Sequence, residues 1–466
     1  MNTSSAQVHS AAEVEAAPRT EFIDSAGAPL IDGWLYALCI LLAGYAMLGK
    51  GFAYVGIPPL FVGELTLLIG SYLFLWFGGW SYVLGRPPVW TLMAVALWGV
   101  VTTLPHISNY GLDALRDAMI WGYAVFAVLV MGGLLAEPNR LPRLIDHYQR
   151  FTIVYLVAIP FTYVISLLEL APTWPWVDVA IVDVKVGDVL VHLAGVFAFW
   201  SSGLSRPVKF RWILLLLSCV ALAGVASRGG LVAFVAACGI CQLFRPFSRL
   251  LWSVALLSIA GLLLLAAVDV RFELPGKGRE FSALQMVESL ISIVDNSGNH
   301  DLDSTKQWRI NWWTDIVNYT WNGEHFWMGK GFGINLADAD GYQGTQWEGQ
   351  LRSPHNGHLT MLARSGVPGF VLWLIPQILW LILILRDSIR SLNYGHRRWN
   401  SLFVFLLAYW AALIVRASFD VFLEGPVGGI WFWTIYGIGL SATVIYSYRP
   451  EILAEREDVD EDSAGS

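Results

Sequence analysis

Charged residues are scarce in this chain of 466 residues. Asp, Glu, Lys and Arg make up 14% of it, whereas 56% of the residues are hydrophobic. A soluble globular protein carries roughly 25% charged residues, so this chain lacks the polar side chains that a water-facing surface needs. Its aromatic content of 14% and mean hydropathy of +0.55 also exclude a disordered chain. The composition therefore predicts a membrane protein.

Cysteine is equally scarce, which excludes a scaffold held together by disulfides. All four cysteines, Cys39, Cys219, Cys238 and Cys241, lie inside apolar runs, where packed helices make disulfide pairing unfavourable. Cys238 and Cys241 have the CxxC spacing, but the second Cys or His pair that a zinc site requires is missing. We expect four free thiols.

Cofactor and nucleic-acid motifs are missing as well. The sequence has no P-loop, no GxGxxG fingerprint, no zinc pattern of His, Asp and Glu, and no basic stretch for nucleic acid. Two acidic pairs, Asp301/Asp303 and Asp338/Asp340, resemble the pairs that hold a metal and a nucleotide-sugar diphosphate. We interpret them as solvated loop positions, and we expect neither a cofactor nor a metal.

Long apolar runs dominate the sequence instead. A membrane crossing needs about 20 mostly apolar residues, and the runs between Pro, Gly and charged residues give about twelve candidate transmembrane helices. The expected spans are 32–49, 58–79, 89–104, 117–136, 151–170, 187–204, 210–227, 229–244, 250–268, 366–385, 400–417 and 427–447. The predicted fold is an all-α polytopic membrane protein.

Basic residues near the ends of these helices predict the orientation. With the N-terminus inside, the inner connections hold thirteen Lys and Arg residues, and the short outer connections hold five. Because positive charge accumulates on the cytoplasmic side, both termini are expected there. Residues 1–31 would form a tail without a cleavable signal segment, and residues 448–466 an acidic tail. Helices one to nine would fill 32–268, and helices ten to twelve 366–447.

One connection is far longer than the others. Residues 269–365 form a mostly polar stretch with six tryptophans, on the outer side of the membrane in this orientation. Connections longer than about 12–15 residues are usually functional. We therefore expect a large extracytoplasmic loop with helices of its own that carries the chemistry.

The first candidate site residue is Arg228, in the sequence Ser227-Arg228-Gly229-Gly230. Apolar residues flank this motif on both sides, which places it at the outer tip of a short helical hairpin. Glycines let a ligand approach the backbone, and the planar guanidinium group matches phosphate oxygens. The alternative is an interfacial arginine that extends to lipid headgroups beside a Gly-Gly turn.

The second candidate set lies near the middle of the long loop. On a helix running to about Tyr319, Arg309 and Trp313 are neighbours four residues apart, as are Trp308 and Trp312. Aromatic faces suit sugar rings, and arginine suits a phosphate or a carboxylate. The alternative is an amphipathic helix that lies on the membrane with its tryptophans at the interface.

The third candidate set surrounds His355. Ser353 and Pro354 have the residue types of an N-cap and a first helical position, and Gly366 and Pro368 are expected to end the short helix. His355 would then lie in the first turn, where the helix dipole favours a neutral imidazole, the form that a general base needs. A structural histidine at a loop–helix junction is the alternative, and His358 is the weaker candidate base.

The order of these motifs resembles the O-antigen ligase and polymerase superfamily of bacterial surface-polysaccharide enzymes. The resemblance rests on Ser227-Arg228-Gly229-Gly230, on Arg309 with Trp313, on Gly329-Lys330-Gly331-Phe332-Gly333, and on His355-Asn356 followed by Gly366 and Gly369. It is strongest over residues 205–385. It implies an integral-membrane glycosyltransferase of the GT-C-like type in the bacterial cytoplasmic membrane, with the active site facing outward.

The resemblance also implies a reaction and roles for residues. A glycan on undecaprenyl diphosphate would be transferred, without a metal, to an acceptor hydroxyl of a glycan or glycolipid. His355 would be the base, Arg228 and Arg309 would bind the donor diphosphate, and Trp308, Trp313 and Asn356 would contact sugars. Arg116 and Arg416 are further cations for the same cavity, with Asp117 and Asp420 as alternative ion-pair partners.

Ligase and polymerase activity both remain open at this point, because both use the same chemistry. A transporter or flippase for lipid-linked glycans and a non-catalytic assembly subunit are the other hypotheses. A transporter built from two halves should show internal repeats, and the sequence shows none. Membrane lipids are expected neighbours, and nucleic acid is not an expected partner.

Overall fold

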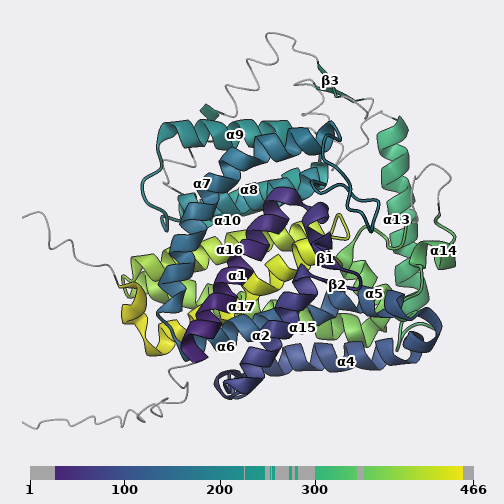
Figure 1. Cartoon of the computed structure of the whole chain (residues 1–466), viewed down its shortest axis with the longest axis horizontal. Helices are drawn as coiled ribbons and strands as arrows, with labels where there is room; N and C mark the ends of the chain where they lie inside the picture. Colours follow the sequence, from purple (N-terminus) through teal and green to yellow (C-terminus); the bar gives the residue numbers. More distant parts are fainter. Residues whose placement is uncertain are drawn as a thin grey trace, which may run out of the picture.

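The computed structural model describes residues 27–224, 226–246, 252, 254, 256–257, 272–274, 279–281, 300–343 and 351–454. Most of both expected tails, most of the expected span 250–268, and residues 344–350 lie outside the described residues. The described part is built almost entirely of helices, which run past one another in a bundle (Figure 1).

The helices of the N-terminal half follow one another closely along the chain. They are α1 (Gly27–Leu48), α2 (Val62–Trp76), α3 (Trp80–Val83), α4 (Pro87–Tyr110), α5 (Leu112–Gly122), α6 (Val125–Ala136), α7 (Arg140–Leu167), α8 (Val186–Ser201), α9 (Phe210–Gly224) and α10 (Arg228–Phe244). A short 3-10 helix, η1 (Lys50–Tyr54), precedes an antiparallel ribbon of β1 (Gly56–Ile57) and β2 (Leu60–Phe61).

The C-terminal half contains two helices of the long loop and three long apolar helices. The loop helices are α13 (His300–Trp321) and α14 (Leu336–Asp340), and the long helices are α15 (Gly357–Asn393), α16 (Arg397–Ala417) and α17 (Pro426–Tyr448). A second antiparallel ribbon joins β3 (Phe272–Leu274) to β4 (Arg279–Phe281), and η2 (Pro450–Leu453) follows α17.

The polytopic fold is confirmed, but a count of twelve spans is not. Within the described residues, six helices are long and apolar enough to cross a membrane, or seven if α5 and α6, bent by 43°, form one span. The four helices α2, α8, α9 and α10 are apolar but have only 15–17 residues. Such helices are about 22–26 Å long, which is short of a bilayer core of about 30 Å. The apolar runs of the sequence correctly predicted these four helices. Their short lengths distinguish them from the candidate membrane spans.

The first helix begins at Gly27, five residues before the expected start at 32. The residues up to Leu30 are mostly small and polar, and Asp32 stands at the edge of the apolar run. In the structure the buried Arg140 pairs with Asp32 (Nε to Oδ1, 2.5 Å) and donates a hydrogen bond to the carbonyl of Ala28 (3.1 Å). The carboxylate is thus neutralised inside the helix, and the helix continues through it.

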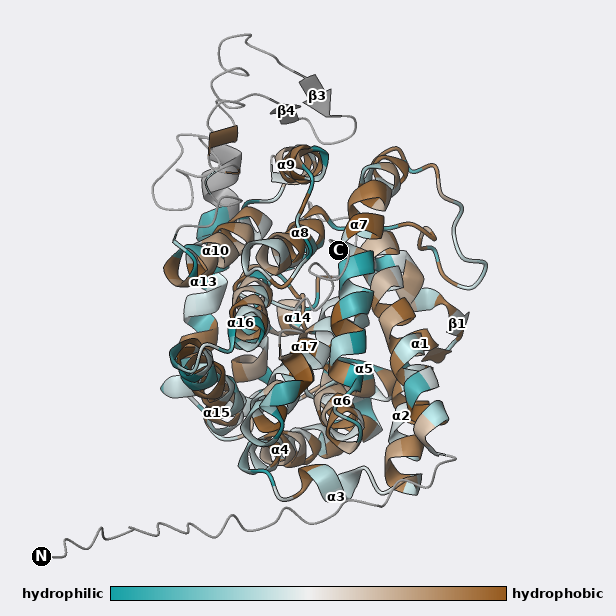
Figure 2. Ribbon diagram, turned by 90° about the vertical axis from the view of Figure 1, so that its left-hand side faces the viewer, coloured by the Kyte–Doolittle hydropathy of each residue, from teal (hydrophilic) through white to brown (hydrophobic). Residues whose placement is uncertain are grey.

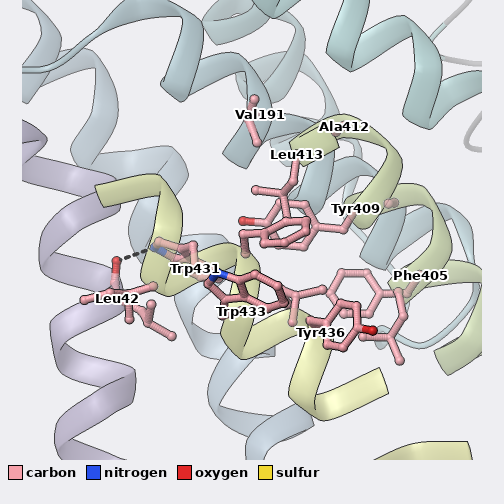
Figure 3. Close-up of a cluster of buried hydrophobic side chains, with 14 of the residues drawn as sticks. Leu42, Val191, Phe405, Tyr409, Ala412, Leu413, Trp431, Trp433 and Tyr436 are labelled. Carbon is pink, nitrogen blue, oxygen red and sulfur yellow. Dashed lines mark hydrogen bonds between the residues drawn. The ribbon is translucent and has the colours of Figure 1, made fainter. Parts of the chain in front are cut away.

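Helices α16 and α17 form the centre of the bundle. They are far more buried than the other candidate spans, and Figure 2, which looks along the bundle, shows the other helices arranged around α17. Aromatic side chains fill the space between them (Figure 3). Their polar atoms are used: Trp431 Nε1 donates to the carbonyl of Leu42 (2.8 Å), and Trp380 Nε1 donates to that of Tyr436 (2.9 Å).

Helix α15 is broken at Gly366, whose φ of 68° and ψ of −175° are not helical. The expected stop at Gly366 is therefore present, but the helix resumes at once and continues to Asn393. The loop after α13 bonds to the backbone around this break. Lys330 N donates to Ala363 O (2.7 Å), Gly331 N to Arg364 O (3.0 Å), and Val367 N to Phe326 O (2.8 Å). These bonds fix the long loop to the start of a candidate span.

The contact between α6 and α17 generates a stability prediction. A Cβ atom on Gly437 would lie 2.6 Å from the carbonyl oxygen of Ala127, which is backbone and cannot turn away. We expect Gly437→Ala to lower the free energy of unfolding by about 1–3 kcal/mol, although alanine normally stabilises a helix relative to glycine. Thermal unfolding in detergent measures the effect. Gly239→Ala, in open space on α10, is the control, and equal stability of the two variants would contradict the prediction.

Candidate functional site

The N-termini of α8 and α10 meet at the end of the bundle that carries α13. Ser227 caps α10 by accepting a hydrogen bond from Gly230 N (3.3 Å), so the motif lies at the tip of the α9–α10 hairpin, as predicted. A Cβ on Gly230 would lie 2.8 Å from the Cα of Gly187, and one on Gly229 would lie 2.7 Å from the Cβ of Phe419. The glycines therefore let the starts of α8 and α10 pack backbone against backbone and let α10 approach the side chain of Phe419, just after α16.

Five charged or titratable side chains lie together at this junction, and we call them the Asp420 cluster. They are Lys185, Asp188, His355, Arg416 and Asp420. Arg416, which is buried, pairs with Asp188 (Nε to Oδ1, 3.0 Å) and also with Asp420. Asp420 further lies 3.3 Å from Nδ1 of His355 and 3.8 Å from Nζ of Lys185. The cluster joins the start of α8, the end of α16 and the segment just before the cap of α15.

The surroundings of Asp420 keep its carboxylate charged. Burial opposes the ionised form, but the hydrogen bond with His355 and the charges of Arg416 and Lys185 hold the pKa of Asp420 well below its ordinary value. An ionised carboxylate can only accept hydrogen bonds. His355 therefore donates from Nδ1 to Asp420, and in the neutral imidazole Nε2 is the nitrogen that keeps the lone pair.

Arg309 enters the same region from α13. Its Nη1 donates a hydrogen bond to the carbonyl of Phe419 (3.3 Å), the residue before Asp420. Burial lowers the pKa of Arg309, the charge of Asp420 raises it, and the charges of Arg416 and Arg228 lower it. The charges of Arg228 and Arg416 therefore both act on Arg309. Arg309 contacts Phe419, and Arg416 pairs with Asp420, which also holds His355.

His355 does not lie in the first turn of a helix, so this prediction was wrong. Asn356, not Ser353, is the N-cap of α15, because its Oδ1 accepts hydrogen bonds from the backbone N–H groups of His358 and Leu359 (both 3.1 Å). His355 precedes this cap with a positive φ of 52°, which a helix does not allow. The better cap lay three residues further along the chain than the sequence suggested.

The three residues expected to contact sugars all have contacts within the protein. Trp313 Nε1 donates to the carbonyl of Pro354 (2.8 Å) and so holds the residue before His355. Asn356 is used as the helix cap. Trp308 packs edge to face on Trp312 and Tyr342, with ring centroids 5.3 and 6.1 Å away. These contacts position the loop, whatever further role the side chains have.

Arg116 belongs to a different cluster. It is about half exposed and pairs with Asp113 (3.2 Å) and Asp117 (3.4 Å). Asp117 also accepts from Gly333 N (3.2 Å) and pairs with the buried Arg364 (3.0 Å) and with Arg352 (3.1 Å). Arg116 is thus part of the network that ties the loop 331–334 to α5, and the alternative that Asp117 is its ion-pair partner is confirmed.

Other expectations have clear outcomes. Asp340 is not solvated, because its carboxylate is buried, pairs with Lys330 and accepts from Trp312 Nε1 (2.6 Å). Asp340 thereby fills a polar gap beneath α13, whereas Asp338 is exposed, as expected; the side chains of Asp301 and Asp303 lie outside the described residues. All four cysteines are free, as expected. Among the described residues, no group of three or more His, Cys, Asp or Glu residues has the arrangement of a metal site.

Part of the chain is similar to a known protein family: residues 213–374 match the family model of the O-antigen ligases. The resemblance inferred from the motifs is therefore confirmed for this segment, which contains Arg228, Arg309 and His355. Lys185, Asp188, Arg416 and Asp420 lie outside the matched segment, although they complete the cluster around His355. No curated protein matches the chain.

Sequence reasoning missed four residues of the two charged clusters: Lys185, Asp188, Arg352 and Arg364. Lys185 and Asp188 stand three residues apart at the start of an apolar run. Two opposite charges at such a place were the sequence feature that could have identified them as members of a charged cluster. Arg352 and Arg364 flank the His355 motif at a spacing that suggests no pairing. Only the fold brings both of them to Asp117.

The two clusters predict different effects for two arginines that were grouped together by sequence. Replacing Arg416 by Gln leaves Asp188 and Asp420 buried without their main counter-charge, which we expect to cost about 3–5 kcal/mol of stability. Arg116→Gln removes a half-exposed pair and should cost about 0–1 kcal/mol. Thermal unfolding of the purified variants in detergent measures both. Similar unfolding temperatures for the two variants would show that Arg416 is not a structural centre.

Proposed function

We propose that the protein transfers a glycan from undecaprenyl diphosphate to an acceptor sugar hydroxyl during the assembly of surface polysaccharide. The observation that carries this proposal is that His355 bonds to an ionised Asp420, which also pairs with Arg416 of α16. Arg309 of α13 contacts the preceding residue, Phe419, and the charge of Arg228 on α10 acts on Arg309. A base and a concentrated positive charge are the two groups that such a transfer requires. The family of residues 213–374 supports the same chemistry.

His355 acts as the general base in this proposal. Asp420 holds Nδ1, which orients the ring and stabilises the positive charge that forms when Nε2 accepts a proton. The acceptor oxygen bonds to the anomeric carbon while the bond from that carbon to the diphosphate oxygen breaks. The electron pair of this bond leaves with undecaprenyl diphosphate, and the acceptor proton goes to Nε2. A single displacement of this kind inverts the configuration at the sugar.

Arg228 and Arg309 bind the diphosphate leaving group. Fixed guanidinium groups stabilise the negative charge that develops as the bond breaks, without having to reorganise, and the N-termini of α8 and α10 add positive potential at the same place. These groups take the charge-neutralising role, so the proposed transfer is metal-independent. Arg416 already neutralises Asp188 and Asp420, so we assign it to positioning the site. The partners of Arg116 likewise favour a structural role.

Sugar recognition is proposed for the surface beside this site. Trp313 adjoins the His355 loop, and Trp308 stands five residues earlier on the same helix, where it packs on Trp312 and Tyr342. We propose that their rings offer aromatic faces for a glycan. Asn356 supports the loop as its cap. The acceptor is a glycan or a glycolipid, and both ligase and polymerase activity fit the same arrangement.

The proposed orientation places the Asp420 cluster on the outer face of the bacterial cytoplasmic membrane. The excess of basic residues in the inner connections supports it. The start of α1 and the end of α17 lie at the end of the bundle opposite α13 (Figure 1), which agrees with both termini on the inner side. A site at one end of the bundle also differs from the midplane sites of transporters.

A direct transfer assay tests the function. Purified protein in lipid bilayers receives an undecaprenyl-diphosphate-linked glycan, first alone and then with candidate acceptors, and product size is read on a gel. Longer lipid-linked chains from donor alone indicate a polymerase, and transfer only after addition of a core-type acceptor indicates a ligase. Absence of transfer with a donor that binds would contradict the proposal and favour transport or an assembly role.

The role of His355 predicts a loss of turnover without a loss of donor binding. We expect His355→Ala to lower turnover by about 10²–10⁴ fold, the usual contribution of a general base, while the folded variant still binds the donor. His147→Ala, on α7 away from the Asp420 cluster, is the control and should keep normal turnover. Near-normal turnover of the His355 variant would remove this residue from the mechanism.

The proposed role of Arg228 and Arg309 predicts that donor binding depends on the shape of these side chains as well as on their charge. Lysine keeps the positive charge but lacks the planar fork, and the loss of one charged hydrogen bond, about 1.5–3 kcal/mol, weakens binding by about tenfold or more. We therefore expect Arg228→Lys and Arg309→Lys each to weaken donor binding by that factor. Binding is measured in the His355→Ala background, so that turnover does not interfere. Arg116→Lys is the matched control, and equal affinities of all three variants would contradict the assignment.

A further inference from the structure

Helix α13 carries an exposed apolar face that the Asp420 cluster does not use. Ile310, Val317 and Trp321 are 41%, 38% and 48% exposed, although each is large and apolar. At about 100° per residue these positions lie within about 40° of one another around the helix, so they form a single stripe. We call these three residues the α13 apolar stripe.

Different residues occupy the other sides of α13. The exposed polar residues Gln307 and Thr314 border the stripe, and the side centred about 110° from it carries the exposed polar residues Asn311, Asp315 and Asn318. About 60–100° in the other direction lie Trp313 and Arg309, which contact the His355 loop and the end of α16. The buried Trp312 and Ile316 complete the circle. A water-facing helix with a polar side available has no reason to expose a tryptophan beside it.

The apolar surface continues beyond the helix to a candidate membrane span. After α13 the chain exposes Trp327 (67%) and Met328 (39%). The neighbouring Phe326 accepts the hydrogen bond from Val367 N (2.8 Å), where α15 resumes after its break. From there α15 exposes the side chains of Val371, Leu374, Ile375, Ile378 and Ile382. The stripe is therefore continuous with the surface that a span presents to lipid.

The direction of α13 agrees with such a position. Figure 1 shows α13 lying across the end of the bundle, roughly at right angles to α4 and α15, and Figure 2 shows it toward the outside of the bundle. The helix packs against α15. A helix that lies in a membrane interface runs along the plane of the bilayer, buries one apolar face, and carries tryptophan at headgroup depth.

We propose that the α13 apolar stripe, together with Trp327 and Met328, is immersed in the membrane leaflet at this end of the bundle, with lipid hydrocarbon as its occupant. The polar side of α13 then faces water, and Arg309 lies between lipid and the Asp420 cluster at the depth of lipid phosphates. This placement combines the two hypotheses for the helix, because one side serves the site and another side binds the membrane. It holds whether or not the protein is a glycosyltransferase.

Spin labelling of the full chain in lipid nanodiscs tests the proposal without any activity assay. The four native cysteines are first replaced by alanine, and nitroxide labels are then placed through Val317→Cys, Trp321→Cys and the matched control Asn318→Cys. Collision with oxygen, which concentrates in lipid, is compared with collision with a water-soluble nickel complex. We expect a several-fold higher ratio of oxygen to nickel collisions at 317 and 321 than at 318.

Two results would overturn the proposal. Equal and high nickel accessibility at 317, 318 and 321 would show that the stripe faces water. Immobile labels at 317 and 321, inaccessible to both reagents, would show that protein covers the stripe, for instance in a second copy of the chain. Val317→Cys is a small change on an exposed position, so the test stands even if the tryptophan variant does not fold.

Discussion

The ion pairs of Arg416 hold the functional end of this protein together. One buried guanidinium group bridges Asp188 at the start of α8 and Asp420 beyond the end of α16, and Asp420 in turn carries His355. A buried charge is costly unless it is paired, so each member of this set depends on the others. The close backbone contact of Gly187 and Gly230 brings α10, and with it Arg228, against the same centre. The positions of three helix ends thus follow from one set of electrostatic partners.

The cluster also explains why the proposed base has a defined orientation. His355 stands outside any helix, with a positive φ, on a short segment between the long loop and α15. Trp313 holds the carbonyl before it, and Asn356 caps the helix after it. Asp420 then fixes the ring from the opposite side. Three contacts from different parts of the chain therefore position one imidazole beside the arginines.

Sequence reasoning succeeded where the signal is local and failed where it depends on pairing in space. Apolar runs located most of the helices, and the motifs located Arg228, Arg309 and His355, because glycines, caps and periodicity act over a few residues. A count of twelve spans is not confirmed, since an apolar run does not reveal whether 15 residues reach across a bilayer. Asp188 and Arg364 were missed because their partners, Arg416 and Asp117, lie more than 200 residues away in the chain.

The break at Gly366 has a consequence for how this protein unfolds. A helix interrupted at a candidate span leaves carbonyl and N–H groups without their usual partners, and here the segment 326–331 supplies three of those partners. Pulling that segment away would uncover these groups next to an apolar environment, where they are expensive to leave unpaired. The segment and both halves of α15 therefore form one cooperative unit. Local opening of the long loop must stop short of this segment or involve the whole helix.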